Sequence, residues 1–181
     1  MNFLFRFLLT FNATSLLVII FLVQKSYTLS YFFKDCISLV LLPNYISYLA
    51  YLLIPVLLTG LSIKLSSRLG KDCFAEGSIV SIEHANNSFL PSYLGYFFVA
   101  LSVNNWETLF FVYGILFIFT FLSQALYFNP LFLVFRFEFY NITTRNGAAI
   151  FLISRKHYKK PDDVILNKVY RINNYTYIEK D

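Results

Sequence analysis

The densest positive charge in the chain is a short run near the carboxyl terminus, Arg155, Lys156, His157, Tyr158, Lys159 and Lys160. Such side chains bind anions, and three partners are open: anionic lipid, an acidic protein and nucleic acid. Near a bilayer each Lys or Arg gains about 1 kcal/mol from anionic lipid. Direct nucleic-acid binding is the least favoured, because a charge patch alone has no geometry for reading bases. The candidates for contact with lipid or a partner are Arg155, Lys156, Lys159, Lys160, Arg145, Lys168 and Arg171.

Catalytic and metal-binding chemistry finds little support in the sequence. A zinc site needs three or four ligands at compatible spacing, whereas Glu83 and His84 form an isolated pair and His157 lies in the basic run. Cys36 and Cys73 are expected on opposite sides of a membrane, so they would share neither a disulfide nor a metal. We therefore expect a protein that is not an enzyme, with no catalytic residues, no cofactor and no metal site.

The composition is that of a membrane protein. Hydrophobic residues make up 57% of the 181 residues and charged residues only 14%, and the mean hydropathy is +0.59. Soluble domains average about 25% charged residues. A bilayer core of about 30 Å needs roughly 20 helical residues, and four apolar segments approach that length. The sequence predicts an α-helical integral membrane protein with four transmembrane helices and a small C-terminal cytoplasmic β-rich domain. The predicted spans are 7–23, 45–63, 87–103 and 109–128, in a membrane domain 1–128 that is followed by a tail domain 129–181.

The basic residues predict an orientation for these spans. With four crossings, the amino terminus, the loop 64–86 and the tail share one side of the membrane. That side holds all but two of the 15 Lys and Arg residues, the exceptions being Lys25 and Lys34. Because cytoplasmic segments carry an excess of Lys and Arg, both chain ends are expected in the cytoplasm.

Few polar residues lie within the apolar segments. Ionisable groups at mid-depth would indicate a transport path, and their scarcity disfavours a coupled transporter, although a pore lined by hydroxyls stays open. Asn12 and Gln124 are expected to join helices by hydrogen bonds of about 1 kcal/mol. Aromatic residues at helical spacing either anchor the helices at the headgroup level or contact a partner subunit. The candidates for helix–helix contact are Asn12, Tyr48, Tyr51, Tyr96 and Gln124.

Period-two alternation predicts short strands in the loop and the tail. In the loop it covers Ser78 to Glu83, a segment that could pair with strands of the tail. In the tail, Phe135 to Tyr140 and Ala148 to Ser154 flank a turn at Asn146-Gly147. Two further candidates, 169–172 and 175–178, surround Asn173-Asn174. The apolar face of such a sheet needs a cover, which the loop, the membrane or a second chain could supply.

Three stretches carry a resemblance to a known family: NNSFLPSYLGYFFVA at 86–100, FYNITTRNG at 139–147 and RINNYT at 171–176. They resemble KwaA, the membrane subunit of the Kiwa anti-phage system. The resemblance implies a multi-pass protein of the bacterial inner membrane that forms a homo-oligomer, with a tetramer favoured. It also implies a cytosolic partner, the DNA-binding subunit KwaB, so that nucleic acid would be reached through the partner.

The function expected on these grounds is that of a membrane sensor and scaffold in an anti-phage complex. Apolar helices that pack through shape and a few hydrogen bonds should respond to bilayer thickness and tension. A change in packing would then alter the surface on which the cytosolic partner docks. The alternatives are a small oligomeric channel or pore that depolarises the membrane, and a simple membrane anchor.

Overall fold

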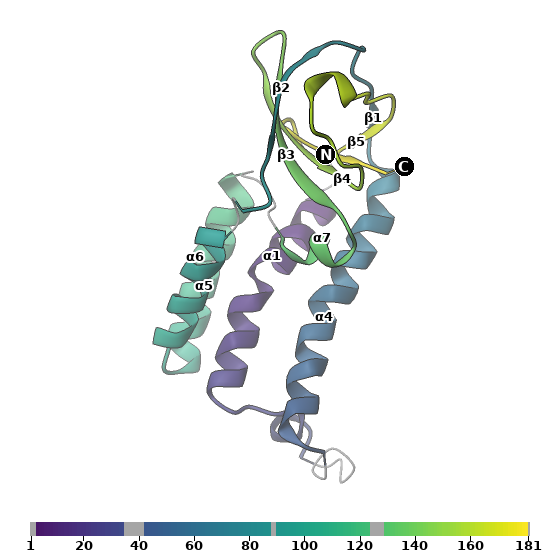
Figure 1. Ribbon diagram of the computed structural model, residues 1–181. Helices are drawn as coiled ribbons and strands as arrows, with labels where there is room; N and C mark the ends of the chain where they lie inside the picture. Colours follow the sequence, from purple (N-terminus) through teal and green to yellow (C-terminus); the bar gives the residue numbers. More distant parts are fainter. Residues whose placement is uncertain (1–2, 35–41, 88–89, 124–128, 181) are drawn as a thin grey trace.

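The computed structural model describes residues 3–34, 42–87, 90–123 and 129–180. The helices lie together at one end of the molecule and the strands at the other (Figure 1). The helical elements are α1 (Phe3–Gln24), α2 (Leu29–Phe32), α4 (Asn44–Leu65), η1 (Ser66–Arg68), α5 (Leu90–Ser102), α6 (Trp106–Ser123), α7 (Leu131–Val134) and η2 (Pro161–Asp163). The strands are β1 (Lys71–Asp72), β2 (Ile79–His84), β3 (Glu138–Thr144), β4 (Ala149–Ser154), β5 (Val169–Arg171) and β6 (Thr176–Glu179).

Helix α1 is the central rod of the helical end. It packs against α4 on one side and against α5 and α6 on the other. It ends where Ser26 takes a left-handed φ of 55° and the Tyr27 amide donates to the Leu22 carbonyl at 2.9 Å. This arrangement satisfies a carbonyl that the last helical turn would leave unpaired. The chain then returns along α4 toward the sheet (Figure 1).

The prediction of a four-span helical membrane protein is wrong. Within the described residues, only α1 and α4 are long and apolar enough to cross a bilayer, while α5 and α6 supply shorter apolar runs. The 13 residues of α5 extend about 20 Å, well short of a core of about 30 Å. Strand β2 continues to His84, and the described part of α5 begins at Leu90. Asn105 caps the start of α6 by accepting from the Thr108 amide at 2.8 Å.

The strands form a single six-stranded mixed sheet in the order β1-β5-β6-β4-β3-β2. All neighbours are antiparallel except β4 and β6, which run parallel. The predicted loop strand is confirmed as β2, which pairs with β3, and β1 pairs with β5. The sheet therefore takes two strands from before residue 128, and the division into domains at that point stays a prediction.

The predicted hairpin is also confirmed, with a shifted beginning. Gly147 has a φ of 76° in the turn between β3 and β4. The first strand begins at Glu138 rather than Phe135, because residues 131–134 are helical and Arg136 takes a left-handed φ of 62°. The turn at Asn173-Asn174 is confirmed between β5 and β6, where the Ile172 amide donates to the Thr176 carbonyl at 2.9 Å.

The two faces of the sheet have separate covers. One face packs on the helix ends, through Phe5 and Leu9 of α1, Ile63 of α4 and Phe132 of α7. The other face is covered by the connection from β4 to β5, whose Val164 and Leu166 are buried against Leu152 and Tyr177. The cover that the sequence left open is thus supplied by this same chain on both sides.

Candidate functional site

A buried polar cluster joins α1 to α4 in the middle of the helical end. Asn12, Thr59 and Asn129 are each at most 2% exposed, and their side chains meet beside the Pro55 carbonyl. The Asn12 amide nitrogen donates to that carbonyl at 3.1 Å, while its oxygen accepts from the Thr59 hydroxyl at 2.6 Å and from the Asn129 amide at 2.8 Å. Asn12 thus bonds both α4 and Asn129, which lies two residues before α7.

Residues of α4 supply two of the groups that meet in this cluster, the Pro55 carbonyl and the Thr59 hydroxyl. The Thr59 hydroxyl comes within 2.8 Å of the Pro55 carbonyl one turn later. Buried polar groups need partners, and in an apolar surrounding those partners come from the neighbouring helix. Thr59 and Asn129 were missed in the sequence, although each is a hydrogen-bonding residue beside an apolar run.

The aromatic candidates make contacts within the chain. Tyr51 is buried and its hydroxyl donates to the Tyr27 carbonyl at 3.1 Å. Tyr96 is half-buried and lies edge-on to Tyr93, with ring centroids 5.6 Å apart. Tyr48 is half-buried on α4, and Gln124 lies outside the described residues.

The basic candidates fall into three separate groups. Arg155, Lys156, Lys159 and Lys160 follow β4, whereas Arg145 lies at the tip of the β3–β4 hairpin. The six residues of β4 separate these two groups by about 20 Å. Lys168 and Arg171 belong to a third group beside the β1 edge, where Arg171 pairs with Asp72 at 3.5 Å.

Two of the basic side chains after β4 are held by contacts with the sheet. The Lys156 ammonium donates to Glu179 at 2.6 Å, and the Arg155 guanidinium lies 4.7 Å from the centre of the Phe137 ring. Lys159 and Lys160 are exposed beyond them. The side chains of Lys159 and Lys160 therefore remain candidates for contact with a partner.

Glu179 is a charged group buried at the end of β6. Its side chain is 4% exposed and accepts from Ser154 at 2.7 Å, from Tyr158 at 2.7 Å and from Lys156 at 2.6 Å. Burial and the hydrogen bond to this carboxylate raise the pKa of the Tyr158 hydroxyl. A buried carboxylate needs such partners, so this network fixes the loop after β4 to the sheet.

A second carboxylate, Glu138, begins β3 at the same end of the sheet. Tyr140 donates to it, and the His157 Nδ1 and His84 Nε2 atoms lie at 2.9 Å and 3.8 Å from its oxygens. Burial acts to raise the pKa of Glu138, but the bonds from Tyr140 and His157 outweigh it, so the pKa is lowered. Burial and the bond to Glu138 raise the pKa of Tyr140 to about 12.

Neither carboxylate forms part of a metal site in the described part of the chain, where no group of three potential ligands converges. Cys73 is exposed and free, and Cys36 lies outside the described residues. The arrangement can bind anions and hold a loop in place. The expectation of a protein without enzymatic activity stays a prediction.

Comparison with known proteins identifies a family. A model of the family described as anti-phage protein KwaA matches residues 5–178, nearly the whole chain. No curated protein and no solved structure matches. The family match confirms the resemblance seen in the three sequence stretches, and it supports a role in defence against phage. The chain therefore belongs to the family of the anti-phage protein KwaA.

Proposed function

We propose that this protein is a membrane-embedded scaffold of an anti-phage defence system, which responds to disturbance of the bilayer and presents its sheet to a cytosolic partner. The observation that carries the proposal is the apolar outer surface of the helices. Large side chains of α4, α5 and α6 are exposed, including Leu53 and Leu57 at 54% and 63%, Phe98 at 69% and Phe111 at 71%. Soluble monomers rarely expose contiguous apolar patches of more than a few hundred Å².

The chain offers lipid contact at one end and charged surface at the other. Helices α1 and α4, with 22 residues each, extend about 33 Å, which fits the hydrocarbon core. The sheet and most basic residues lie at one end of this helix pair, beyond the amino end of α1 and the carboxyl end of α4. The positive-inside rule then puts the sheet and both termini in the cytoplasm of a bacterium, with the helices in the inner membrane.

The packing supplies a route from the bilayer to the sheet. Phe5 and Leu9 of α1 and Ile63 of α4 share one apolar core with Phe139 and Phe151 of the sheet. A change in bilayer thickness or tension that alters the angle between α1 and α4 would therefore move the surface on which the sheet rests. The partner proposed is the cytosolic Kiwa subunit KwaB, and the contact proposed is the exposed pair Lys159 and Lys160. A homo-oligomer, with a tetramer favoured, stays a prediction.

The test uses cells that carry this protein together with KwaB. The double variant Lys159→Glu, Lys160→Glu reverses two exposed charges after β4, and it should abolish both co-purification of KwaB and protection from phage. The matched control, Arg145→Glu with Lys168→Glu, reverses two exposed charges elsewhere on the same sheet and should retain both. Equal loss of KwaB from the two variants would rule out this docking surface.

The rival function is a channel, and a second experiment, with purified protein in liposomes, distinguishes it from the scaffold. Purified protein in liposomes should produce no ion flux in the absence of KwaB if it is a scaffold. Flux that begins when the bilayer is stretched would favour a pore instead.

A further inference from the structure

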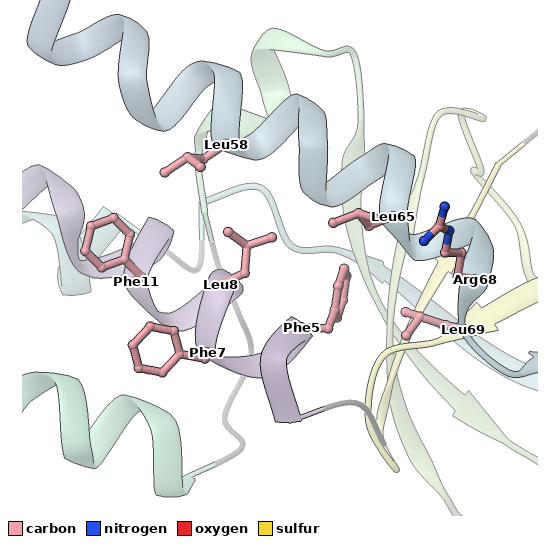
Figure 2. A pocket seen from close by; sticks show the side chains of 8 residues that line it. All are labelled: Phe5, Phe7, Leu8, Phe11, Leu58, Leu65, Arg68 and Leu69. Carbon is pink, nitrogen blue, oxygen red and sulfur yellow. The ribbon is translucent and has the colours of Figure 1, made fainter.

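An apolar groove lies between α1 and α4 at the end nearest the sheet (Figure 2). Its volume is about 540 Å³, within the roughly 300–1,000 Å³ of sites for small ligands. Apolar side chains of both helices line it, among them Phe11, Leu8, Leu58 and Leu65, and the single charged residue in its lining is Arg68. Figure 2 shows Arg68 at the sheet end of the groove, beyond Leu65 and away from Phe11 and Leu58.

A second, polar pocket begins at the same arginine. It has a volume of about 380 Å³ and is lined by Arg68, Gly70, Arg171, Asn173 and Asn174. Arg171 is 53% exposed and pairs with Asp72 at 3.5 Å, while the side-chain Oδ1 atom of Asn173 accepts from the Tyr175 amide at 2.8 Å. Arg68 therefore lies between an apolar groove among the helices and a polar, positively charged pocket against the sheet.

The charge of Arg68 has no partner in this protein as far as the structure describes it. Its side chain is exposed, and no carboxylate of residues 3–34, 42–87, 90–123 and 129–180 pairs with it. A guanidinium binds phosphate through two parallel hydrogen bonds, which makes arginine the usual partner of that group. A ligand that suits both halves of the site has a hydrocarbon chain and an anionic phosphate.

We propose that the groove and the pocket bind one anionic phospholipid, with an acyl chain between α1 and α4 and its phosphate on Arg68. This inference rests on the proposed function, since the bilayer supplies the lipid. The cytoplasmic leaflet, where the sheet is placed, is the one rich in anionic lipid. A bound lipid would contact α1, α4 and the end of β5 together, so its loss during phage attack would loosen the joint between helices and sheet.

The test is native mass spectrometry of the full chain in detergent, titrated with phosphatidylglycerol or with phosphatidylcholine of identical chains. The wild-type protein should bind one phosphatidylglycerol more tightly than phosphatidylcholine. Arg68→Gln should weaken the binding of phosphatidylglycerol about tenfold, because the charge-assisted hydrogen bonds to the phosphate are lost. Lys64→Gln is the matched control: Lys64 is exposed one turn earlier, does not line the groove, and its loss should leave binding unchanged.

A second variant examines the apolar half of the site. Leu8→Trp adds volume inside the groove. It should weaken the binding of both lipids equally, because it displaces the acyl chain and not the headgroup. Arg68→Gln changes an exposed side chain and leaves the core intact, so it decides the question even if Leu8→Trp fails to fold.

Three results would overturn the lipid site: equal binding of the two lipids by the wild-type protein, unchanged binding in Arg68→Gln, or equal loss in Lys64→Gln. Dimers that form irrespective of added lipid and are lost in Leu8→Trp would show that a second copy fills the groove. Carbonate extraction of membranes measures the proposed function separately. A protein that stays in the pellet but has no preference for phosphatidylglycerol disproves the lipid site alone.

Discussion

Lys180, one residue after β6, donates to the backbone carbonyl of Ile63 in the last turn of α4. Its ammonium also lies 2.8 Å from the Ser67 hydroxyl. Cations are favoured at the carboxyl end of a helix, where unpaired carbonyls point outward. Burial, with a smaller contribution from the charge of Arg155, lowers the pKa of this lysine. A single side chain thus connects the end of the sheet to the end of α4.

Replacement of Lys180 by Met should loosen that joint. The hydrogen bonds to Ile63 and Ser67 would be lost, and amide hydrogen exchange should become faster in β6 and the last turn of α4. Lys168→Met is the matched control, because the ammonium groups of Lys180 and Lys168 lie at similar distances from the centre of the Tyr170 ring, 5.6 Å and 5.9 Å. Equal exchange in the two variants would show that the bond to α4 has no effect on the joint.

The cluster around Asn12 should couple α1 to α4 energetically. Asn12→Ala removes the buried amide that bonds Pro55, Thr59 and Asn129, and it should reduce the free energy of unfolding by about 1–3 kcal/mol. A double-mutant cycle with Thr59→Val should give a coupling of about 0.6 kcal/mol, the average between membrane helices, and of about 1.7 kcal/mol at most. Ser102→Ala, which removes a hydroxyl bonded only within its own helix, is the control for loss of a polar group. Additive effects of Asn12 and Thr59 would contradict the geometry described.

Gly60 allows α4 to approach the segment after α7. A Cβ atom at this position would lie 3.2 Å from the Phe135 ring, whereas one at Gly114 would meet nothing within 4 Å. Gly60→Leu should therefore destabilise the protein by about 1–3 kcal/mol, as overpacking does. Gly114→Leu should be neutral or stabilising, because leucine has a higher helix propensity than glycine. Thermal unfolding in detergent measures both, and equal changes would mean that Phe135 moves aside freely.

The lowered pKa of Glu138 predicts a loss of stability in acid. A carboxylate whose folded pKa is depressed stabilises the fold above its ordinary value near 4.5, and that contribution disappears as the pH falls through the folded pKa. Stability should therefore decline below about pH 4.5 in the wild-type protein and less steeply in Glu138→Gln. The control is Glu83→Gln, an exposed carboxylate on the neighbouring strand. Identical acid profiles for the wild type and Glu138→Gln would refute the role of the two histidines and Tyr140.

The sheet was more predictable from the sequence than the helices. Alternation from Ser78 to Glu83 and the Asn146-Gly147 turn are local signals, and both correspond to strands. The parallel pairing of β4 with β6 depends on the connection 155–168, which has no comparable local pattern. The predicted number of long helices was wrong because apolar composition does not show where a helix begins or ends, and the described helix α5 has 13 residues.

The candidate site was predictable in part. Asn12 was recognised because an amide in an apolar segment needs a partner, but its partners Thr59 and Asn129 are 47 and 117 residues away in sequence. The distance between Arg145 and Lys159 likewise depends on β4, which lies between them. The pattern of charges in the sequence does not predict that distance.

The most direct test is to measure on which side of the membrane the sheet lies. Cys73 is exposed at the sheet end, so a Cys36→Ser variant carries one reactive thiol there. A membrane-impermeant maleimide should leave Cys73 unlabelled in intact spheroplasts and label it in inside-out vesicles, with the protein retained in the membrane after carbonate washing. Labelling in intact spheroplasts, or release of the protein by the wash, would contradict the account.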